Sequence, residues 1–435
     1  MSLSRYQRYK DSGVRWIGQV PAHWEVDRLK RKVRLITDKS EKRTRAVALE
    51  NIEGWTGRFL ETETEFQGEG VSFCEGDVLF GKLRPYLAKV YVTEFDGEAV
   101  GDFHVMRPAQ SLANRFALYQ MLTGEFISVV DGSTFGAKMP RADWESVGAM
   151  PLAIPPMSEQ LEIVRFLDRE TAKIDTLIDG QKRLIELLKE KRQAVISHAV
   201  TKGLDANAPL KDSGVEWLGE VPAHWIVTPL MHLTPTDRSI MYGIVLPGPN
   251  VEEGVPIVKG GDVKPNRLRL ASLNRTTVEI EKAYERARLN PNDIVYSIRG
   301  SIGDAELVPS ELKEANITQD VARVSPRDGI NSRWLLYAMK SDPIFVQLEQ
   351  RSLGAAVRGI NIFDLKRVRV PCPPRAEQDQ IAAFLDAKLA ALDALESEAQ
   401  TATQLLREHR SALIAAAVTG KIDVREVIGN EVEAA

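Results

Sequence analysis

KDSGVRWIGQVPAHWEV, residues 10–26, and KDSGVEWLGEVPAHWIV, residues 211–227, are two versions of one segment. Thirteen of the 17 positions are identical, at an offset of 201 residues. Self-similarity over such a distance is typical of a duplicated structural unit. The 435-residue chain is therefore expected to contain one fold twice.

A second pair of repeats follows the first in the same order, at an offset of 218 residues. Residues 154–175, IPPMSEQLEIVRFLDRETAKID, match residues 372–393, CPPRAEQDQIAAFLDAKLAALD, and residues 187–203 match residues 405–421. Because the matching blocks recur in the same order, chance does not explain them.

The segments between the matching blocks, residues 27–150 and 228–368, have diverged further and differ by 17 residues in length. Short apolar runs alternate in them with Gly, Pro and Asp, as in GDVLFGKLRPYLAKVYV at residues 76–92. This pattern predicts strands joined by tight turns, with one helix near Arg115–Leu122 and its counterpart near Arg333–Met339. The predicted fold class is α+β, with two tandem copies of a mixed α/β domain that differ in their surfaces.

A helical pattern, unlike the strand pattern before it, begins after each double proline, at Pro156 and at Pro374. Glu159 and Glu377 fall in the first turn, where a negative charge is favourable. Apolar residues then recur at spacings of three, four and seven. The first helix is predicted to run from Ser158 to about Thr201, a length of roughly 65 Å.

An apolar stripe along so long a helix needs a partner, and the second copy of the helix supplies one. We therefore predict two coiled-coil-like helices that pair antiparallel, with the domains at opposite ends and an approximate two-fold axis between them. The alternative is that each helix packs on its own domain. Four polar residues interrupt the stripe and either select the register or bind an additional protein: Gln181, Arg192, Glu396 and Arg410.

These patterns divide the chain into five parts. They are a first domain (1–155), a first long helix (156–205), a second domain (206–371), a second long helix (372–424) and a C-terminal tail (425–435).

The composition indicates a soluble globular protein of the cytoplasm. No stretch approaches about 18 consecutive apolar residues, and residues 1–10 do not have the pattern of a secretory signal. Cys74 and Cys372 are too few for a disulfide framework, and we expect both to be buried and inert. The net charge of −4 argues mildly against nucleic acid as a partner, so any DNA-binding surface must be local.

The sequence lacks the common motifs of an enzyme that acts on nucleotides or DNA. GSTFGAK at residues 132–138 lacks the end of a phosphate-binding loop, and the double prolines are not those of an amino-methyltransferase. The six histidines have no metal-ligand spacing, and His23 and His224 are assigned to packing. We therefore predict no catalytic residue, no metal site and no bound cofactor.

At this point the residues carry a family resemblance. The segments WIGQVPAHWEV and WLGEVPAHWIV resemble the start of the target-recognition domains of type I restriction-modification specificity subunits, and PPMSEQLEIVRFLD and PPRAEQDQIAAFLD resemble the start of that family's conserved helices. The resemblance covers essentially the whole chain. It implies a non-catalytic subunit that binds a bipartite, asymmetric site in double-stranded DNA.

The resemblance also implies partners. Two adenine-methyltransferase subunits would bind the conserved helices and use S-adenosylmethionine and base flipping. Restriction subunits that use ATP and Mg²⁺ can then join the complex.

The divergent segments are expected to read the DNA, because identical segments cannot distinguish different half-sites. For the same reason the four tryptophans of the repeats, Trp16, Trp24, Trp217 and Trp225, are assigned to core packing. The candidate DNA-binding residues are clustered cations: Lys39, Lys42, Arg43, Arg45, Lys82, Arg84, Lys138 and Arg141 in the first domain, and Lys259, Lys264, Arg267, Arg269, Arg299 and Arg358 in the second.

Two other functional classes remain open from the sequence. One is a coiled-coil interaction scaffold that does not bind DNA, which would lack salt-dependent duplex binding. The other is a fused DNA methyltransferase or nuclease, which would need a cofactor loop or metal cluster in residues 27–150 or 228–368.

Overall fold

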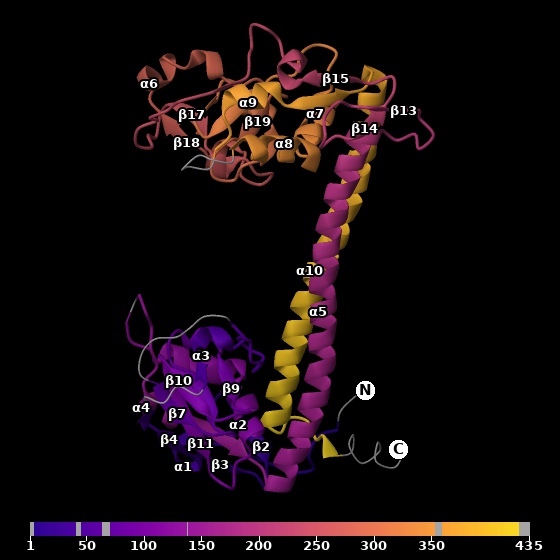
Figure 1. Ribbon diagram of the computed structural model, residues 1–435. Coiled ribbons are helices and arrows are strands. Elements are labelled where there is room, and N and C mark those ends of the chain that lie inside the picture. Colours follow the sequence, from indigo (N-terminus) through magenta and orange to yellow (C-terminus); the bar gives the residue numbers. More distant parts are fainter. Residues whose placement is uncertain (1–3, 41–44, 63–69, 137, 353–358, 426–435) are drawn as a thin grey trace. The chain divides into compact units, whose positions relative to one another are not determined.

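The computed structural model describes residues 4–40, 45–62, 70–136, 138–352 and 359–425, which form two compact units. The first unit consists of the described residues up to Lys182 together with those from Gln400 onward, and the second consists of those from Arg183 to Ala399. Each unit contains one mixed domain and one half of each long helix (Figure 1). The fold class is α+β with tandem domains and two long helices, as predicted.

The first domain is built on two four-stranded sheets, with the orders β4-β11-β8-β9 and β5-β7-β10-β6. Only the β6–β10 pair of these sheets is parallel. Val78, Leu79 and Phe80 of β8 are fully buried, because this strand lies inside its sheet and is covered on both faces. The strands of the two sheets are β4 (Val33–Ile36), β5 (Lys39–Ser40), β6 (Ala46–Val47), β7 (Gly70–Phe73), β8 (Val78–Gly81), β9 (Val90–Val92), β10 (Gly97–Val100) and β11 (Phe103–Pro108).

Short elements surround these sheets. Thr123 caps α3, and its hydroxyl accepts a hydrogen bond from the Phe126 amide, as a helix N-cap should. The strand pairs are β1–β2 and β3–β12. The elements are β1 (Tyr9–Asp11), β2 (Gln19–Pro21), β3 (Glu25–Arg28), α1 (Leu29–Lys32), the 3₁₀ turns η1 (Leu49–Asn51) and η2 (Pro85–Leu87), α2 (Asn114–Met121), α3 (Gly124–Gly132), α4 (Trp144–Gly148) and β12 (Pro151–Ile154).

The second domain repeats this plan. Its sheets have the orders β16-β22-β19-β20 and β18-β17-β21, the β17–β21 pair is parallel, and β13–β14 and β15–β23 pair outside them. Asn331 caps α7, the counterpart of α2. The strands are β13 (Leu210–Asp212), β14 (Glu220–Pro222), β15 (Ile226–Pro229), β16 (Met241–Tyr242), β17 (Val255–Val258), β18 (Asn274–Thr276), β19 (Ile294–Ser297), β20 (Ala305–Leu307), β21 (Asn316–Ile317), β22 (Val321–Val324) and β23 (Arg369–Cys372). The helices are α6 (Val278–Lys282), α7 (Ser332–Met339), α8 (Asp342–Ser352) and α9 (Ile362–Arg367), and the 3₁₀ turns include η4 (Gly260–Asp262).

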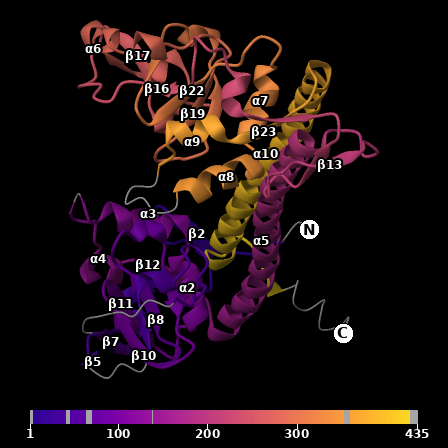
Figure 2. The same cartoon turned by 45° about the horizontal axis from the view of Figure 1, so that its top comes forward.

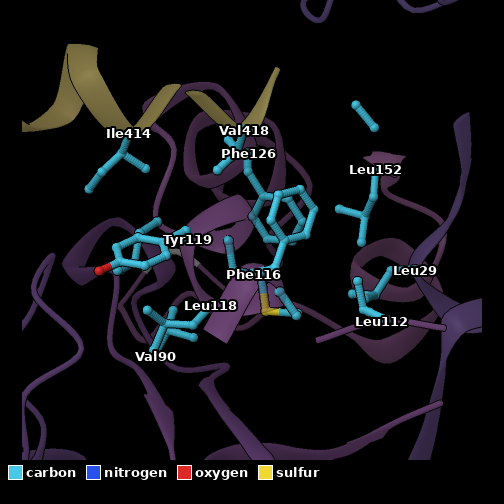
Figure 3. Close-up of a cluster of buried hydrophobic side chains, with 14 of the residues drawn as sticks. Leu29, Val90, Leu112, Phe116, Leu118, Tyr119, Phe126, Leu152, Ile414 and Val418 are labelled. Atoms are coloured by element: carbon cyan, nitrogen blue, oxygen red, sulfur yellow. The ribbon is translucent and has the colours of Figure 1, made fainter. Parts of the chain in front are cut away.

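The two long helices are α5 (Met157–Lys202) and α10 (Arg375–Val418), and their halves lie antiparallel within each unit (Figures 1 and 2). Each half also packs on a domain, so the two packing modes weighed from the sequence occur together. In the first unit Ile414 and Val418 of α10 join a core with Phe116 and Phe126 of the first domain (Figure 3). The end of the chain therefore completes the core of its beginning.

A pair of ionic contacts marks the seam between the helices. Arg410 of α10 forms an ion pair with Asp175 of α5 at 2.9 Å in the first unit, and Arg192 of α5 pairs with Asp393 of α10 in the second. These contacts favour the register-selection alternative. Arg410 is buried, which corrects its assignment to a partner surface. Gln181 and Glu396 are half-buried, and their partner role stays a prediction.

The structure corrects two further expectations about burial. Cys74 is exposed and Cys372 partly exposed, because both lie near strand ends rather than inside a sheet. Trp24 and Trp225 are fully buried, Trp16 is half-buried, and Trp217 is 38% exposed although its segment is repeated. Only three of the four repeated tryptophans therefore pack as predicted.

Candidate nucleic-acid interface

Two loops of the first domain meet at the surface and bring four of the predicted cations together. The Arg84 amide donates to the Pro140 carbonyl oxygen at 2.8 Å, and the Ala142 amide donates to the Lys82 carbonyl oxygen at 2.9 Å. Phe135 and Arg141 exchange two backbone hydrogen bonds, so the second loop closes on itself. Lys82, Arg84, Lys138 and Arg141, selected separately from the sequence, thus belong to one surface.

The positive charges of this surface are not equally available to a ligand. Arg141 donates two hydrogen bonds to the Asp102 carboxylate, both at 3.0 Å, and this contact raises the pKa of the Arg141 guanidinium. Its positive charge is therefore balanced within the domain, and it positions the loop. Arg84 and Lys138 are exposed, and Lys82 is half-buried.

The remaining predicted cations of the first domain lie near the other sheet. Lys39 is in β5, and the Arg45 guanidinium lies 3.7 Å from the centre of the Phe95 ring and also contacts Glu61. Lys42 and Arg43 lie outside the described residues. The sequence grouped these four cations together, and the structure gives Arg45 contacts within the domain instead.

In the second domain the predicted cations lie on a long loop and on a tight turn. Lys264, Arg267 and Arg269 are exposed, whereas Lys259 is half-buried beside η4. Arg299 is exposed, and a side chain on Gly260 would lie 3.1 Å from the Arg299 carbonyl oxygen, so the backbones of the loop and the turn approach closely. Arg358 lies outside the described residues.

Equivalent loops of the two domains are used differently. Both loops follow a 3₁₀ turn after the strand that pairs in parallel, η1 after β6 and η4 after β17. In the first domain this loop contacts the helices, since Arg410 donates to the Trp55 and Thr56 carbonyl oxygens and Arg58 pairs with Asp175. In the second domain it holds the exposed cations Lys264, Arg267 and Arg269.

Sequence reasoning missed the apolar side chains of the first surface. Tyr86 and Leu87 on η2, and Phe135 and Met139 on the facing loop, are all exposed. Neither periodicity nor a motif marks them. A local signal exists in the charges, because residues 82–89 and 132–141 contain no Asp or Glu.

The described part of the chain provides no metal site and no membrane-spanning element. Among those residues no group of three or more His, Cys, Asp or Glu side chains is placed to hold a metal ion. None of their helices is long and apolar enough to cross a bilayer.

Comparisons with known proteins identify a matching family model and similar proteins. The family model described as type I restriction modification DNA specificity domain matches residues 249–404. The EcoBI type I restriction enzyme specificity subunit of Escherichia coli is 28% identical over 314 residues, which are 71% of this chain and 66% of that protein. The chain is thus similar to type I specificity subunits in sequence, most clearly in its second half.

Other similar proteins cover more than nine tenths of this chain. A putative MjaX type I specificity subunit of Methanocaldococcus jannaschii is 23% identical over 96% of this chain and 99% of its own length. A chain from a structure of type I restriction-modification complex assembly has a TM-score of 0.65 at 18% identity, covering 92% of this chain and 98% of its own. The HsdS subunit of Thermoanaerobacter tengcongensis has a TM-score of 0.51 at 19% identity, covering 93% of this chain and 98% of its own. At such identities the structural likeness concerns the fold.

Proposed function

We propose that this chain is a type I specificity subunit and binds double-stranded DNA with both domains, each of which reads one half of a bipartite, asymmetric target. The observation that carries the proposal is the contrast between the repeated scaffold and the two unlike basic surfaces built on it. The first surface has Arg84 and Lys138 on paired loops, and the second has Lys264, Arg267 and Arg269 on one exposed loop. Cations bind phosphates, and unlike surfaces select unlike half-sites.

We further propose that the chain carries no chemistry of its own and works in the cytoplasm with catalytic partners. Two adenine-methyltransferase subunits would bind the long helices and supply S-adenosylmethionine chemistry. Restriction subunits would supply ATP and Mg²⁺ chemistry. The support is the repetition of the helix starts in the two halves, with 8 of 14 positions identical between residues 155–168 and 373–386, because similar surfaces suit two copies of one partner.

Methylation mapping tests the proposal in cells with and without the protein. A bipartite adenine-methylated motif should appear only when the protein is present. Exchange of residues 27–150 for the same segment of another specificity subunit should change one half of the motif. A change in both halves, or no dependence on the protein, would contradict the proposal.

Binding measurements separate this function from a scaffold that does not touch DNA. Affinity of the purified complex for its target should fall steeply with salt, with a log–log slope of about −0.9 per neutralised phosphate. The triple variant Lys264→Ala, Arg267→Ala, Arg269→Ala should make that slope shallower. Lys282→Ala removes another exposed cation of the same domain and should leave the slope unchanged. A wild-type complex without a salt slope would favour the scaffold.

A further inference from the structure

The paired loops of the first domain expose large apolar side chains between cations. Phe135 is 61% exposed, Tyr86 and Met139 are each 47% exposed, and Leu87 is 37% exposed. A cluster of exposed apolar side chains is costly in water and indicates a contact surface. We call this surface the loop patch and define it as Arg84, Tyr86, Leu87, Phe135, Lys138 and Met139.

The η2 part of the loop patch is fixed by its backbone conformation and by contacts with residues 49 and 55. Arg84 and Ala88 bracket η2 with left-handed backbones, at φ of 51° and 47°. The Trp55 amide donates to the Ala88 carbonyl oxygen at 2.9 Å, and the Lys89 ammonium donates to the Leu49 carbonyl oxygen at 2.6 Å. Non-glycine residues adopt this conformation only where their surroundings fix it. The exposed side chains of Tyr86 and Leu87 are therefore presented on a preorganised turn.

The charge of the two loops selects the kind of partner. Residues 82–89 and 132–141 contain five Lys and Arg residues and no Asp or Glu, in a chain whose net charge is −4. Of these cations Arg84 and Lys138 are exposed, whereas Arg141 is balanced by Asp102. Exposed cations around apolar side chains are complementary to a polyanion that also offers apolar groups, and the DNA major groove offers the thymine methyl group.

The position of the loop patch argues against a methyltransferase contact. A subunit bound in two copies needs the same surface in both halves of the chain. The loop patch lies in the diverged segments, and η2 stands between β8 and β9 where the second domain has a tight turn around Gly300–Gly303 between β19 and β20. A surface whose residues differ between the two halves fits the half-site that its own half reads.

We propose that the loop patch is the base-reading surface of the first domain. Tyr86 and Phe135 contact thymine 5-methyl groups in the major groove, and Arg84 and Lys138 bind the flanking phosphates. This inference rests on the proposed function and adds the chemical feature that one half-site must contain. That half-site includes at least one thymine besides the one opposite the methylated adenine.

Replacement of thymine by uracil removes only the methyl group and so tests the contact directly. The complex is purified through a tag on this chain, and the half-site of the first domain is assigned by the exchange of residues 27–150. Every thymine in it, except the one opposite the methylated adenine, is replaced by uracil. The wild-type complex should bind the uracil duplex about fourfold more weakly for each contacted methyl group.

Variants then assign the effect to the loop patch. The double variant Tyr86→Ala, Phe135→Ala should bind the thymine and uracil duplexes with nearly equal affinity, and each single alanine variant should show a ratio between that and the wild-type ratio. Tyr86→Phe keeps the ring and should keep the wild-type ratio. Phe363→Ala is the matched control, because Phe363 is 56% exposed but belongs to the second domain. It should keep the wild-type ratio for the first half-site. Thermal unfolding checks that each variant is folded.

Three results would overturn the inference without touching the proposed function. They are a first half-site with no further thymine, a wild-type complex that does not distinguish uracil from thymine, and alanine variants of Tyr86 and Phe135 that keep the wild-type ratio. Loss of methyltransferase subunits from the Phe135→Ala complex would identify the loop patch as a protein contact and would overturn it too. Absence of any specific DNA binding or methylation in the wild type would instead refute the proposed function.

Discussion

In the first unit Asp168 accepts hydrogen bonds from Arg115 and Tyr119, and in the second Asp386 accepts them from Arg333 and Tyr337. Trp24 and Trp225 likewise donate to Glu159 and Glu377, the carboxylates that open the long helices. The contacts that fix each domain to the helix after it are therefore the same in both halves.

The seam contacts differ between the halves. The Arg410 guanidinium is buried against Asp175, which also pairs with Arg58 at 3.2 Å. The side chains of Arg192 and Asp393 are 40% and 55% exposed. At the repeat offset of 218 residues, Asp175 corresponds to Asp393 and Arg410 to Arg192. The same two positions thus form a buried ionic network in the first unit and an exposed ion pair in the second. The comparison teaches that duplication kept the scaffold contacts, whereas the loops around them changed.

The largest expected difference between the halves is at this seam. Arg410→Met should lower the free energy of unfolding of the first unit by about 3 kcal/mol, because it leaves Asp175 buried with only Arg58 as a partner. Arg192→Met should cost less than about 1 kcal/mol, because water replaces the lost contact. Calorimetry measures the change, and hydrogen exchange shows which unit opens. Equal losses would mean that the two pairs are equivalent after all.

A smaller difference is expected at the carboxylates that open the helices. Glu159 is buried and accepts from both Trp24 and His23, whereas Glu377 is half-exposed. Glu159→Ala should cost about 2 kcal/mol, because the Trp24 indole N–H stays buried without an acceptor. Glu377→Ala should cost about 1 kcal/mol, and the two melting temperatures give the comparison. A larger loss from Glu377→Ala would show that the Glu377–Trp225 contact is better shielded from water than the Glu159–Trp24 contact.

A smaller difference is expected where a long helix passes the turn between two short helices. This turn lies between α7 and α8 in the second unit and between α2 and α3 in the first. In the second unit the Gln193 amide donates to the Lys340 carbonyl oxygen at 2.9 Å. The corresponding residue of α10 is Ser411, and there a groove of about 580 Å³ remains. Gln193→Ala should cost about 1 kcal/mol and Ser411→Ala almost nothing, in urea unfolding of the whole chain. A marked loss from Ser411→Ala would show an unrecognised contact in the first unit.

The smallest expected effect is on pH dependence and concerns the second domain. Two hydrogen bonds from the Arg288 guanidinium lower the pKa of the buried Glu281 below its usual 4.5. A carboxylate with a lowered pKa stabilises the fold above its unfolded value and loses that contribution as pH falls through the folded value. The melting temperature should therefore fall less between pH 5 and pH 3 in Glu281→Gln than in the wild type. An unchanged pH profile would contradict the assignment.

Much of the scaffold could be predicted from the sequence, because it repeats. The expected helix from Ser158 to about Thr201 is α5 (Met157–Lys202), and the helices expected near Arg115 and Arg333 are α2 and α7. Trp24 and Trp225 were assigned to the core for the same reason. Repetition shows which residues serve the shared fold, because those residues meet the same neighbours twice.

The surfaces could not be predicted equally well, because exposure depends on neighbours that are distant in sequence. The sequence predicts that Arg410 interrupts an apolar stripe, and the structure buries it against Asp175 and the carbonyl oxygens of Trp55 and Thr56. Arg141 was selected as a cation, and its partner Asp102 lies on another loop. The exposed Phe135 gave no periodic signal. Charge and apolarity mark candidates, and the fold decides which of them reach solvent.

The first unit joins residues that the ribosome makes far apart in time. The Gln120 side chain donates to the Val418 carbonyl oxygen across 298 residues, and the Asp423 amide donates to the Ser4 carbonyl oxygen. Contacts so distant in sequence form late, since the loop between them must close first. The domain that emerges first is thus completed last, and until then the apolar surface that receives α10 stays open to solvent and to chaperones.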